Sequence, residues 1–184
     1  MKYTFILFVI ILSNSLYAYE LRLHFDKSYI EDNILYADVY TKYDSNLYLN
    51  IKKYLDNGVI IALNFRVDLI NKRFLIDKNV KEIFFYRKLY YDFFTKEYVM
   101  FSSENMKEIR DNDFYSLMKN IYKIKIEILN IDKLNKDSKY LFRTRLSIQL
   151  ENAYIYLSVF FNIITPMKYR IKWLKSKEFK INEL

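Results

Sequence analysis

The stretch VIIALNFRVDL, from Val59 to Leu69, alternates between apolar and polar side chains almost without a break. Its odd-numbered residues are all apolar, whereas Asn64, Arg66 and Asp68 fall on the opposite face of an extended chain. An apolar side chain at every second position is typical of a β-strand with one buried and one solvated face. The stretch therefore predicts a long strand of an antiparallel sheet, with its polar side chains in water.

The same alternation appears in two segments further along the chain. Isoleucines alternate with lysine and glutamate in Tyr122–Ile128, and apolar residues alternate with polar ones in Tyr140–Leu150. Tyr154–Ile164 is apolar at nearly every position, which favours a strand buried on both faces. Three shorter segments are also predicted to be strands: Glu20–Phe25, Ile34–Thr41 and Tyr169–Leu174.

The aromatic-rich segment FFYRKLYYDFFTKEYVMF, from Phe84 to Phe101, predicts a β-hairpin. Asp92 and Thr95 bracket a four-residue connection, in which an aspartate bonds its own backbone and starts a turn. Aromatic side chains favour strands and pair across them, so packing explains the cluster, and Tyr98 is predicted to be structural. The dense lysine and arginine interleaving of a nucleic-acid stacking surface is missing from this segment. One face of the first strand is predicted to hold Phe85, Arg87, Leu89 and Tyr91.

Two segments follow the period of a helix. Apolar residues in Asn46–Asn57 recur at helical spacing, and Gly58, the only glycine, stands where a helix closes in the left-handed conformation. Asp111–Tyr122 shows the same spacing, with Asp111 or Asp113 available as the N-cap. The whole pattern predicts an all-β fold, an antiparallel β-sandwich of seven to nine strands with two short helices. A curved sheet closed over by the helices is the alternative.

The N-terminal residues have the three parts of a secretory signal. Lys2 precedes an apolar run, and SNSLYA ends at Ala18, where a small residue marks the cleavage point. The apolar run is shorter than the ~20 residues of a membrane-spanning helix. We therefore expect residues 1–18 to be removed and residues 19–184, beginning at Tyr19, to form a single β-sandwich domain. A retained signal that anchors the protein in the membrane is the alternative, because Leu16 is bulkier than usual for its position.

The chain is basic, with 30 Lys and Arg against 22 Asp and Glu and a formal net charge of +8. A basic exported protein is suited to anionic lipid or acidic polysaccharide, although here the charges are spread through the chain. Arginines are expected on the polar faces of the strands, and they form a basic stripe for an acidic partner or headgroup if these strands are neighbours. Paired surface charges are the alternative. The arginines of this predicted stripe are Arg66, Arg87, Arg143 and Arg145.

Few residues suited to catalysis are present. The chain has no cysteine, one histidine and one glycine, which excludes disulfides, histidine-based triads and glycine-rich phosphate loops. His24 is predicted to be a solvated surface residue. No catalytic residue, metal or cofactor is predicted. The candidate carboxylate pairs for a hydrolase fall in predicted turns or caps, where an exposed structural role is expected: Glu31 with Asp32, Asp92 with Glu97, and Asp111 with Asp113.

The segment LYYDFFTKEYVMF resembles the Leu-x-Tyr-Asp-x-x-Thr-x-x-Tyr signature of a family of exported proteins of Gram-negative bacteria, domain-of-unknown-function family four-three-nine-zero. YLDNGVIIALNFRVDL, YLFRTRLSIQL and FFNIITPMKYRIKW are similar to further segments of that family. The resemblance spans about Leu47 to Trp173. It implies an exported, periplasmic protein with no established activity, and it supplies no catalytic residues.

The expected function is that of an exported, non-enzymatic β-sandwich protein that serves as an envelope accessory or interaction module. Its expected partner is an envelope protein or lipid, with peripheral membrane contact, and not a nucleic acid. The alternative is a periplasmic carrier that holds an apolar or acyl ligand between the sheet layers. A hydrolase built on two carboxylates comes third.

Overall fold

The computed structural model describes residues 22–42, 45–151, 169–170 and 173–184. Within these ranges the chain forms ten β-strands in two antiparallel sheets and two α-helices. The predicted all-β class with two short helices is confirmed. The junction between Ala18 and Tyr19 lies outside the described residues, as does the predicted strand Tyr154–Ile164. None of the described helices is long and apolar enough to cross a bilayer.

The larger sheet is built around the long strand β3 (Ile60–Asn71). β3 pairs with β4 (Lys78–Asp92) on one side and with β8 (Tyr140–Glu151) on the other. The strand order is β10-β8-β3-β4-β5-β6, and β9 pairs with β8. The remaining strands are short: β5 (Glu97–Ser102), β6 (Lys107–Asp111), β9 (Tyr169–Arg170) and β10 (Leu174–Lys175).

The smaller sheet has three strands in the order β1-β2-β7. A two-residue turn joins β1 (Arg22–Glu31) to β2 (Ile34–Lys42), and its residues Asp32 and Asn33 have φ angles of 50° and 63°. Aspartate and asparagine tolerate positive φ better than most residues, and tight two-residue hairpins often require it. β7 (Lys123–Asn130) completes the sheet by pairing with β2.

The helix α2 (Ser45–Asp56) ends at the single glycine, as the sequence predicts. Gly58 has a φ of +78°, in the left-handed region that favours glycine. The Gly58 N–H donates to the Leu55 carbonyl (2.8 Å), and the Val59 N–H donates to the Tyr54 carbonyl (3.0 Å). These two bonds form a Schellman C-cap, which turns the chain out of α2 and into β3.

The helix α3 (Phe114–Tyr122) begins at an aspartate cap. The Asp113 carboxylate accepts hydrogen bonds from the backbone N–H groups of Tyr115 (3.2 Å) and Ser116 (3.1 Å), so Asp113 is the N-cap of the two predicted candidates. Two short 3₁₀-helices complete the described elements: η1 (Ile131–Lys133) and η2 (Ile181–Glu183).

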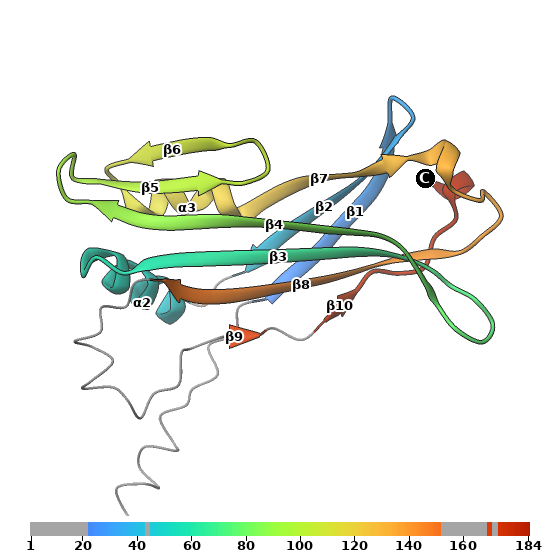
Figure 1. Cartoon of the computed structure of the whole chain (residues 1–184), viewed down its shortest axis with the longest axis horizontal. Helices are drawn as coiled ribbons and strands as arrows, with labels where there is room; N and C mark the ends of the chain where they lie inside the picture. Colours follow the sequence, from blue (N-terminus) through green and yellow to red (C-terminus); the bar gives the residue numbers. More distant parts are fainter. Residues whose placement is uncertain (1–21, 43–44, 152–168, 171–172) are drawn as a thin grey trace, which may run out of the picture.

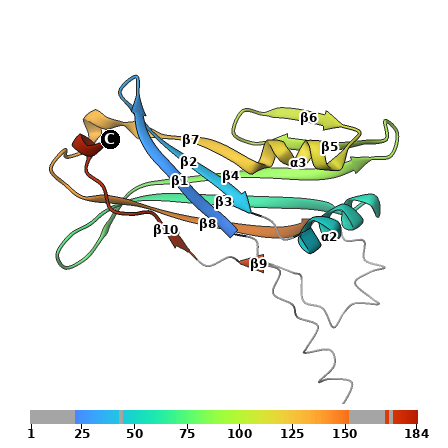
Figure 2. The same ribbon diagram turned by 180° about the vertical axis from the view of Figure 1, so that it is seen from behind.

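The layer that covers the larger sheet is part strand and part helix (Figures 1 and 2). The smaller sheet crosses the larger one obliquely, with β1 in contact with β8 and β10, and β7 in contact with β4. At the other end of the molecule α2 lies against β3 and β4, and α3 lies against β5 and β6. The fold therefore combines the predicted sandwich with the alternative of a sheet covered by helices.

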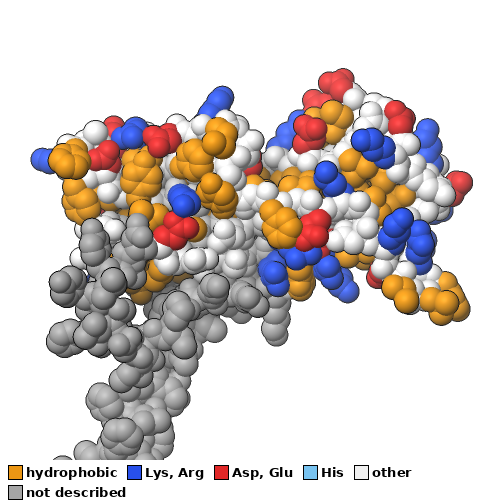
Figure 3. Space-filling model, viewed as in Figure 1, with side chains coloured by type: hydrophobic (Ala, Val, Ile, Leu, Met, Phe, Trp, Pro, Cys, Tyr) orange, Lys and Arg blue, Asp and Glu red, His pale blue; other side chains and the backbone are white. Residues whose placement is uncertain are grey.

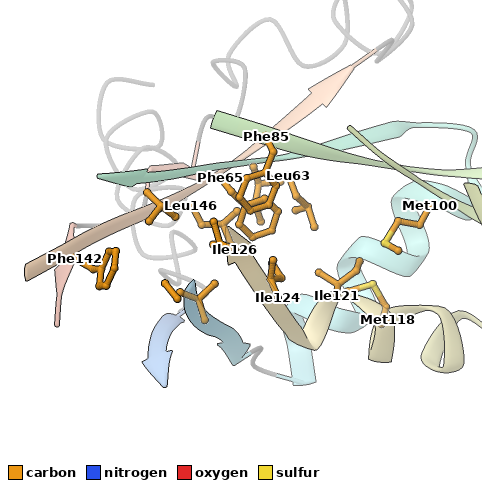
Figure 4. Packing of buried hydrophobic residues seen from close by; sticks show 14 of the residues in the cluster. Leu63, Phe65, Phe85, Met100, Met118, Ile121, Ile124, Ile126, Phe142 and Leu146 are labelled. Carbon is orange, nitrogen blue, oxygen red and sulfur yellow. The ribbon is translucent and has the colours of Figure 1, made fainter. Parts of the chain in front are cut away.

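The core lies between these layers (Figure 4). The ring of Phe65 on β3 stacks on that of Phe85 on β4 at 4.7 Å, and Ile126 of β7 lies close to them. Between β1 and β8, the rings of Phe25 and Phe142 stack at 5.3 Å. Fully burying one large apolar side chain contributes ~1.5–3 kcal/mol, so these contacts between layers are a main source of stability.

The described strands agree with the prediction in the burial pattern of β3 and differ from it in β6, β9 and β10. The odd-numbered residues of Val59–Leu69 are all buried, as predicted. β6 was not predicted, because none of its side chains is buried and its sequence has no apolar face. The predicted strand Tyr169–Leu174 corresponds to the two short strands β9 and β10. With these, the described strands number one more than the expected maximum of nine.

Candidate functional site

The turn of the predicted hairpin lies at Phe93–Lys96, between β4 and β5. The Asp92 Oδ1 atom accepts hydrogen bonds from the backbone N–H groups of Phe94 (2.9 Å) and Thr95 (3.3 Å). This is the local backbone bonding predicted for Asp92, with the connection one residue further along the chain. The same N–H donors lower the pKa of the Asp92 carboxyl, because they stabilise its charged form.

Replacing Asp92 with alanine is expected to lower the melting temperature by about 2–4 °C at neutral pH, through loss of these bonds. The folded-state pKa is depressed, so the contribution of Asp92 is present above the unfolded pKa of ~3.9 and is lost as the pH falls through the folded pKa. The difference between the variant and the parent should therefore close in acid, as thermal melts at several pH values can measure. Asp137→Ala, at an exposed position, is the control and should melt like the parent at neutral pH.

Tyr98 joins the hairpin to both helices. Its side chain is buried, and its ring contacts the rings of Tyr91 (4.9 Å) and Phe114 (5.4 Å). Its hydroxyl donates a hydrogen bond to the Asp56 Oδ1 atom (2.6 Å) at the end of α2. Burial raises the pKa of the Asp56 carboxyl, but hydrogen bonds from Lys52 and Tyr98 together lower it below its ordinary value. Tyr98 therefore has the packing role that the sequence predicted.

The carboxylates near this turn are bound to cations and backbone groups. Asp92 and Glu97 both form ion pairs with Arg110, at 3.2 and 3.6 Å. Asp111 accepts a hydrogen bond from the Asp113 N–H (2.9 Å), which lowers the pKa of the Asp111 carboxyl. The pKa of the Asp92 carboxyl is lowered as well. The shifts are downward, whereas a general acid at neutral pH needs a raised pKa.

The candidate residues of the smaller sheet are placed by strand pairing. Glu31 forms an ion pair with Lys125, and Asp32 is exposed in the turn. His24 is only partly exposed, so the predicted solvated position is wrong. Its pairing partner on β2 is Tyr40, whose ring stacks on the imidazole at 5.0 Å. Within the described ranges, the buried Nε2 atom of His24 has no hydrogen-bond partner.

Arg87 does not belong to a stripe with the other three arginines. It lies on the inner face of β4, opposite Leu63 of β3, and its side chain is buried. Its guanidinium donates two hydrogen bonds to the Glu104 carboxylate (2.5 and 3.1 Å) and one to the Asn120 carbonyl (3.0 Å). The correction follows from the alternation in β4, which puts Arg87 on the face of Phe85; the ion pair makes burial of its charge tolerable.

The other three arginines meet on the outer face of β3 and β8, around Asp68. The register places Asp68 opposite Arg143, and Arg66 opposite Arg145. The Asp68 carboxylate accepts hydrogen bonds from Arg66 Nε (2.9 Å) and from Arg143 Nη2 (2.7 Å) and Nε (3.2 Å). Asp68 is fully buried, so the expectation that it meets water is wrong. Two arginine side chains cover its carboxylate and replace the lost hydration.

Trp173 lies against all three guanidinium groups. The distance from its ring centroid to the guanidinium carbon is 4.3 Å for Arg143, 4.5 Å for Arg145 and 5.1 Å for Arg66. All three are within the ~6 Å range of cation–π attraction. Arg66 also forms an ion pair with Glu82 of β4. We call this group the arginine–tryptophan cluster, and its members are Arg66, Asp68, Glu82, Arg143, Arg145 and Trp173.

Arg145 carries the uncompensated charge of the cluster. Asp68 pairs with Arg66 and Arg143, and Glu82 pairs with Arg66, but no described carboxylate forms an ion pair with Arg145. Three cations against two carboxylates leave a net charge of +1 (3 − 2). A guanidinium stacked on an aromatic ring keeps its N–H donors at its edge, where they can bind a carboxylate or phosphate. The arrangement is suited to binding an anion.

Sequence reasoning found the three arginines of this cluster but not Asp68 or Trp173 as their partners. The alternation of side chains in β3 places Arg66 and Asp68 on one face, which is a signal that the two side chains are neighbours. The pairing of β3 with β8, which brings Arg143 to Asp68, has no local signal, because it depends on strand order in the sheet. The same holds for Trp173, which precedes β10 at the edge of the sheet.

No protein-family model matches the chain, and comparisons with curated proteins and with solved structures give no match. The resemblance to family four-three-nine-zero therefore stays a prediction. Among the residues that the structure describes, no three His, Cys, Asp or Glu side chains gather in a group that could hold a metal ion.

Proposed function

We propose that the protein is an exported, non-enzymatic β-sandwich module that binds an acidic group of an envelope partner through the arginine–tryptophan cluster. The observation that carries the proposal is Arg145, a guanidinium held against Trp173 at 4.5 Å with no carboxylate partner in the described part of the chain. Since guanidinium groups bind carboxylates and phosphates in bidentate geometry, the bound group is an anion of this kind.

The cluster is preorganised for this role. Asp68 fixes Arg66 and Arg143 by hydrogen bonds, and the guanidinium groups of these two side chains lie 5.1 and 4.3 Å from the centroid of the Trp173 ring. A ligand that binds Arg145 therefore does not have to order the surrounding side chains, which reduces the entropy cost of binding. The network also explains how the Asp68 carboxylate can be fully buried on the outer face of the sheet.

The packing between the layers supports a module of this kind over a carrier of an apolar ligand. The Phe142 ring stacks on Phe25 of β1 and on Phe179 near the C-terminus, each at 5.3 Å. These three rings occupy space between β1 and β8 that a carrier would need for a ligand between the layers. Export of the chain is supported by the N-terminal signal pattern, and N-terminal sequencing of secreted material should find Tyr19 first.

The binding test uses the fluorescence of Trp173, which is the only tryptophan of the chain. Titration with oligoglutamate or with polyphosphate is expected to change its emission, and Arg145→Gln is expected to weaken the response about tenfold, as loss of one charged contact predicts. The matched control is Lys133→Gln, which removes one exposed cation outside the cluster and should respond like the parent. Equal responses of the Arg145 and Lys133 variants, or no response to either polyanion, would contradict the proposal.

A further inference from the structure

The loop between β3 and β4 holds three successive apolar side chains in water. Phe74 is 100% exposed, Leu75 86% and Ile76 80%. Single exposed apolar residues are common, but a contiguous exposed group marks an interaction or membrane site. The loop extends beyond the end of both sheets in Figure 1, and Figure 3 shows an apolar group projecting from the surface there. We call Phe74–Ile76 the apolar tip.

The tip is held away from the core by hydrogen bonds and an ion pair at the base of the loop, between β3 and β4. The Lys72 N–H donates to the Lys139 carbonyl (2.8 Å), and the Arg73 N–H donates to Asp77 Oδ1 (3.4 Å). The Lys72 ammonium also forms an ion pair with Asp77 Oδ2 (2.8 Å), which closes the base of the loop. These contacts fix the ends of the loop, so the exposure of the tip is a property of the folded chain.

Basic side chains surround the tip. Residues 72–78 include the three cations Lys72, Arg73 and Lys78 and one carboxylate, Asp77, for a net charge of +2 (3 − 1). Asp77 pairs with Lys72, while Arg73 and Lys78 have no ion pair among the residues that the structure describes. Figure 3 shows Lys and Arg side chains next to the projecting apolar group. An apolar tip with a basic collar has the chemistry of an anionic membrane surface.

The opposite end of the molecule has exposed aromatic residues without such a collar. Phe94 in the turn between β4 and β5 is 99% exposed. The charges beside it are mixed, since Asp92 and Glu97 in this region both pair with Arg110. Its neighbour Phe93 packs edge-on against the ring of Tyr91 at 5.0 Å. Phe94 is therefore a matched control for exposure alone.

We propose that the apolar tip inserts into the surface of a bilayer that contains anionic lipid, while Arg73 and Lys78 contact the lipid phosphates. Apolar side chains at the membrane boundary reach ~5–10 Å into the headgroup and acyl region, a depth that a loop tip can span. A second copy of this chain is a poorer partner, because a symmetric contact would bring two collars of charge +2 together. The inference goes beyond the proposed function, since it uses the end of the sheet and not the arginine–tryptophan cluster.

The direct test labels the tip of the full chain with a fluorophore that responds to polarity. The chain has no cysteine, so Leu75→Cys and Phe94→Cys each provide one labelling site. With vesicles of phosphatidylglycerol and phosphatidylcholine, the label at position 75 is expected to shift to shorter wavelength, and the label at position 94 is not. Vesicles of phosphatidylcholine alone should give a smaller shift at position 75. The absence of a shift at position 75, or an equal shift at both positions, would overturn the proposal.

Unlabelled variants test the collar by sedimentation with the same vesicles. Each basic side chain near an anionic surface strengthens membrane binding several-fold. The double variant Arg73→Gln/Lys78→Gln should therefore bind the vesicles about 30-fold more weakly. Raising the salt concentration should weaken the parent in the same direction. Binding of the double variant equal to that of the parent would overturn the proposal. A spectral shift of the label at position 75 without vesicles would also overturn the proposal. A shift produced by oligoglutamate would assign the tip to an acidic protein partner, and a shift produced by high protein concentration would assign it to self-association. The Trp173 titration should be unchanged in the tip variants, so the two proposals can fail separately.

Discussion

Replacing Tyr98 with alanine is expected to lower the free energy of unfolding by about 3–5 kcal/mol, as is typical when a buried aromatic side chain is removed. Tyr98 is 6% exposed and packs between Tyr91 of β4 and Phe114 of α3, so the loss leaves a cavity where the hairpin meets the second layer. Urea unfolding measures the effect, with an unchanged slope as evidence that the folded state is preserved.

Tyr98→Phe separates the ring from the hydroxyl. This variant keeps the packing and loses the hydrogen bond to Asp56, at a cost of about 0.5–1.5 kcal/mol near neutral pH. The pKa of Asp56 is depressed in the folded state, so the stabilisation is present above the unfolded pKa of ~3.9 and is lost as the pH falls through the folded value. The difference from the parent should therefore narrow in acid. Tyr90→Ala is the control, because Tyr90 lies on the face of β4 opposite to that of Tyr91, the pairing partner of Tyr98. An equal loss of unfolding free energy in Tyr90→Ala and Tyr98→Ala would contradict the packing role.

Replacing Asp68 with alanine is expected to cost about 2–4 kcal/mol, less than the ~3–5 kcal/mol of a completely buried ion pair, because the arginines are partly in water. The carboxylate is fully buried, while the side chains of Arg66 and Arg143 are 26% and 32% exposed. Removing Asp68 leaves two guanidinium groups close together without the anion that holds them. The emission of Trp173 should change as well, since these arginines fix its ring.

Glu82→Ala provides the comparison for Asp68→Ala. Glu82 also pairs with Arg66, but its side chain is 34% exposed, and pairs of this kind typically contribute no more than ~1 kcal/mol. Chemical unfolding of the two variants under the same conditions should therefore give clearly different midpoints. Similar small losses in both would mean that Asp68 is not the centre of the network.

The alternation of side chains was sufficient to predict most of the larger sheet. Every second residue of Val59–Leu69 is buried, and the Asp92 turn lies one residue from its predicted place. These features depend on neighbours in sequence, which is why a local pattern reports them. β6 could not be predicted in this way, because its pairing with β5 is set by the backbone and not by an apolar face.

The outer face of the sheet shows the limit of that reasoning. The alternation of side chains tells which face of a strand a residue is on, but it does not tell whether other side chains cover that face. Asp68 and Arg66 lie on the same face of β3, yet Asp68 is fully buried under two arginines, one of which comes from β8. The error for Arg87 had a different cause. The alternation of side chains in β4 already placed Arg87 on the same face as Phe85, and the predicted stripe did not take this into account.

The order of strands in the two sheets also sets an order of events for the newly made chain. β1 with β2, and β3 through β6, pair with neighbours in sequence, so they can form early as local hairpins. β2 also pairs with β7, and β3 with β8, and both of these partners follow the whole β3–β6 meander in sequence. These two pairings therefore form only after β7 and β8 have been made. Closing such long loops costs entropy before any contact compensates for it, and this slows folding. Until β7 and β8 arrive, the apolar faces of both units are open to other chains, so the interval before sheet closure is when aggregation is most favourable.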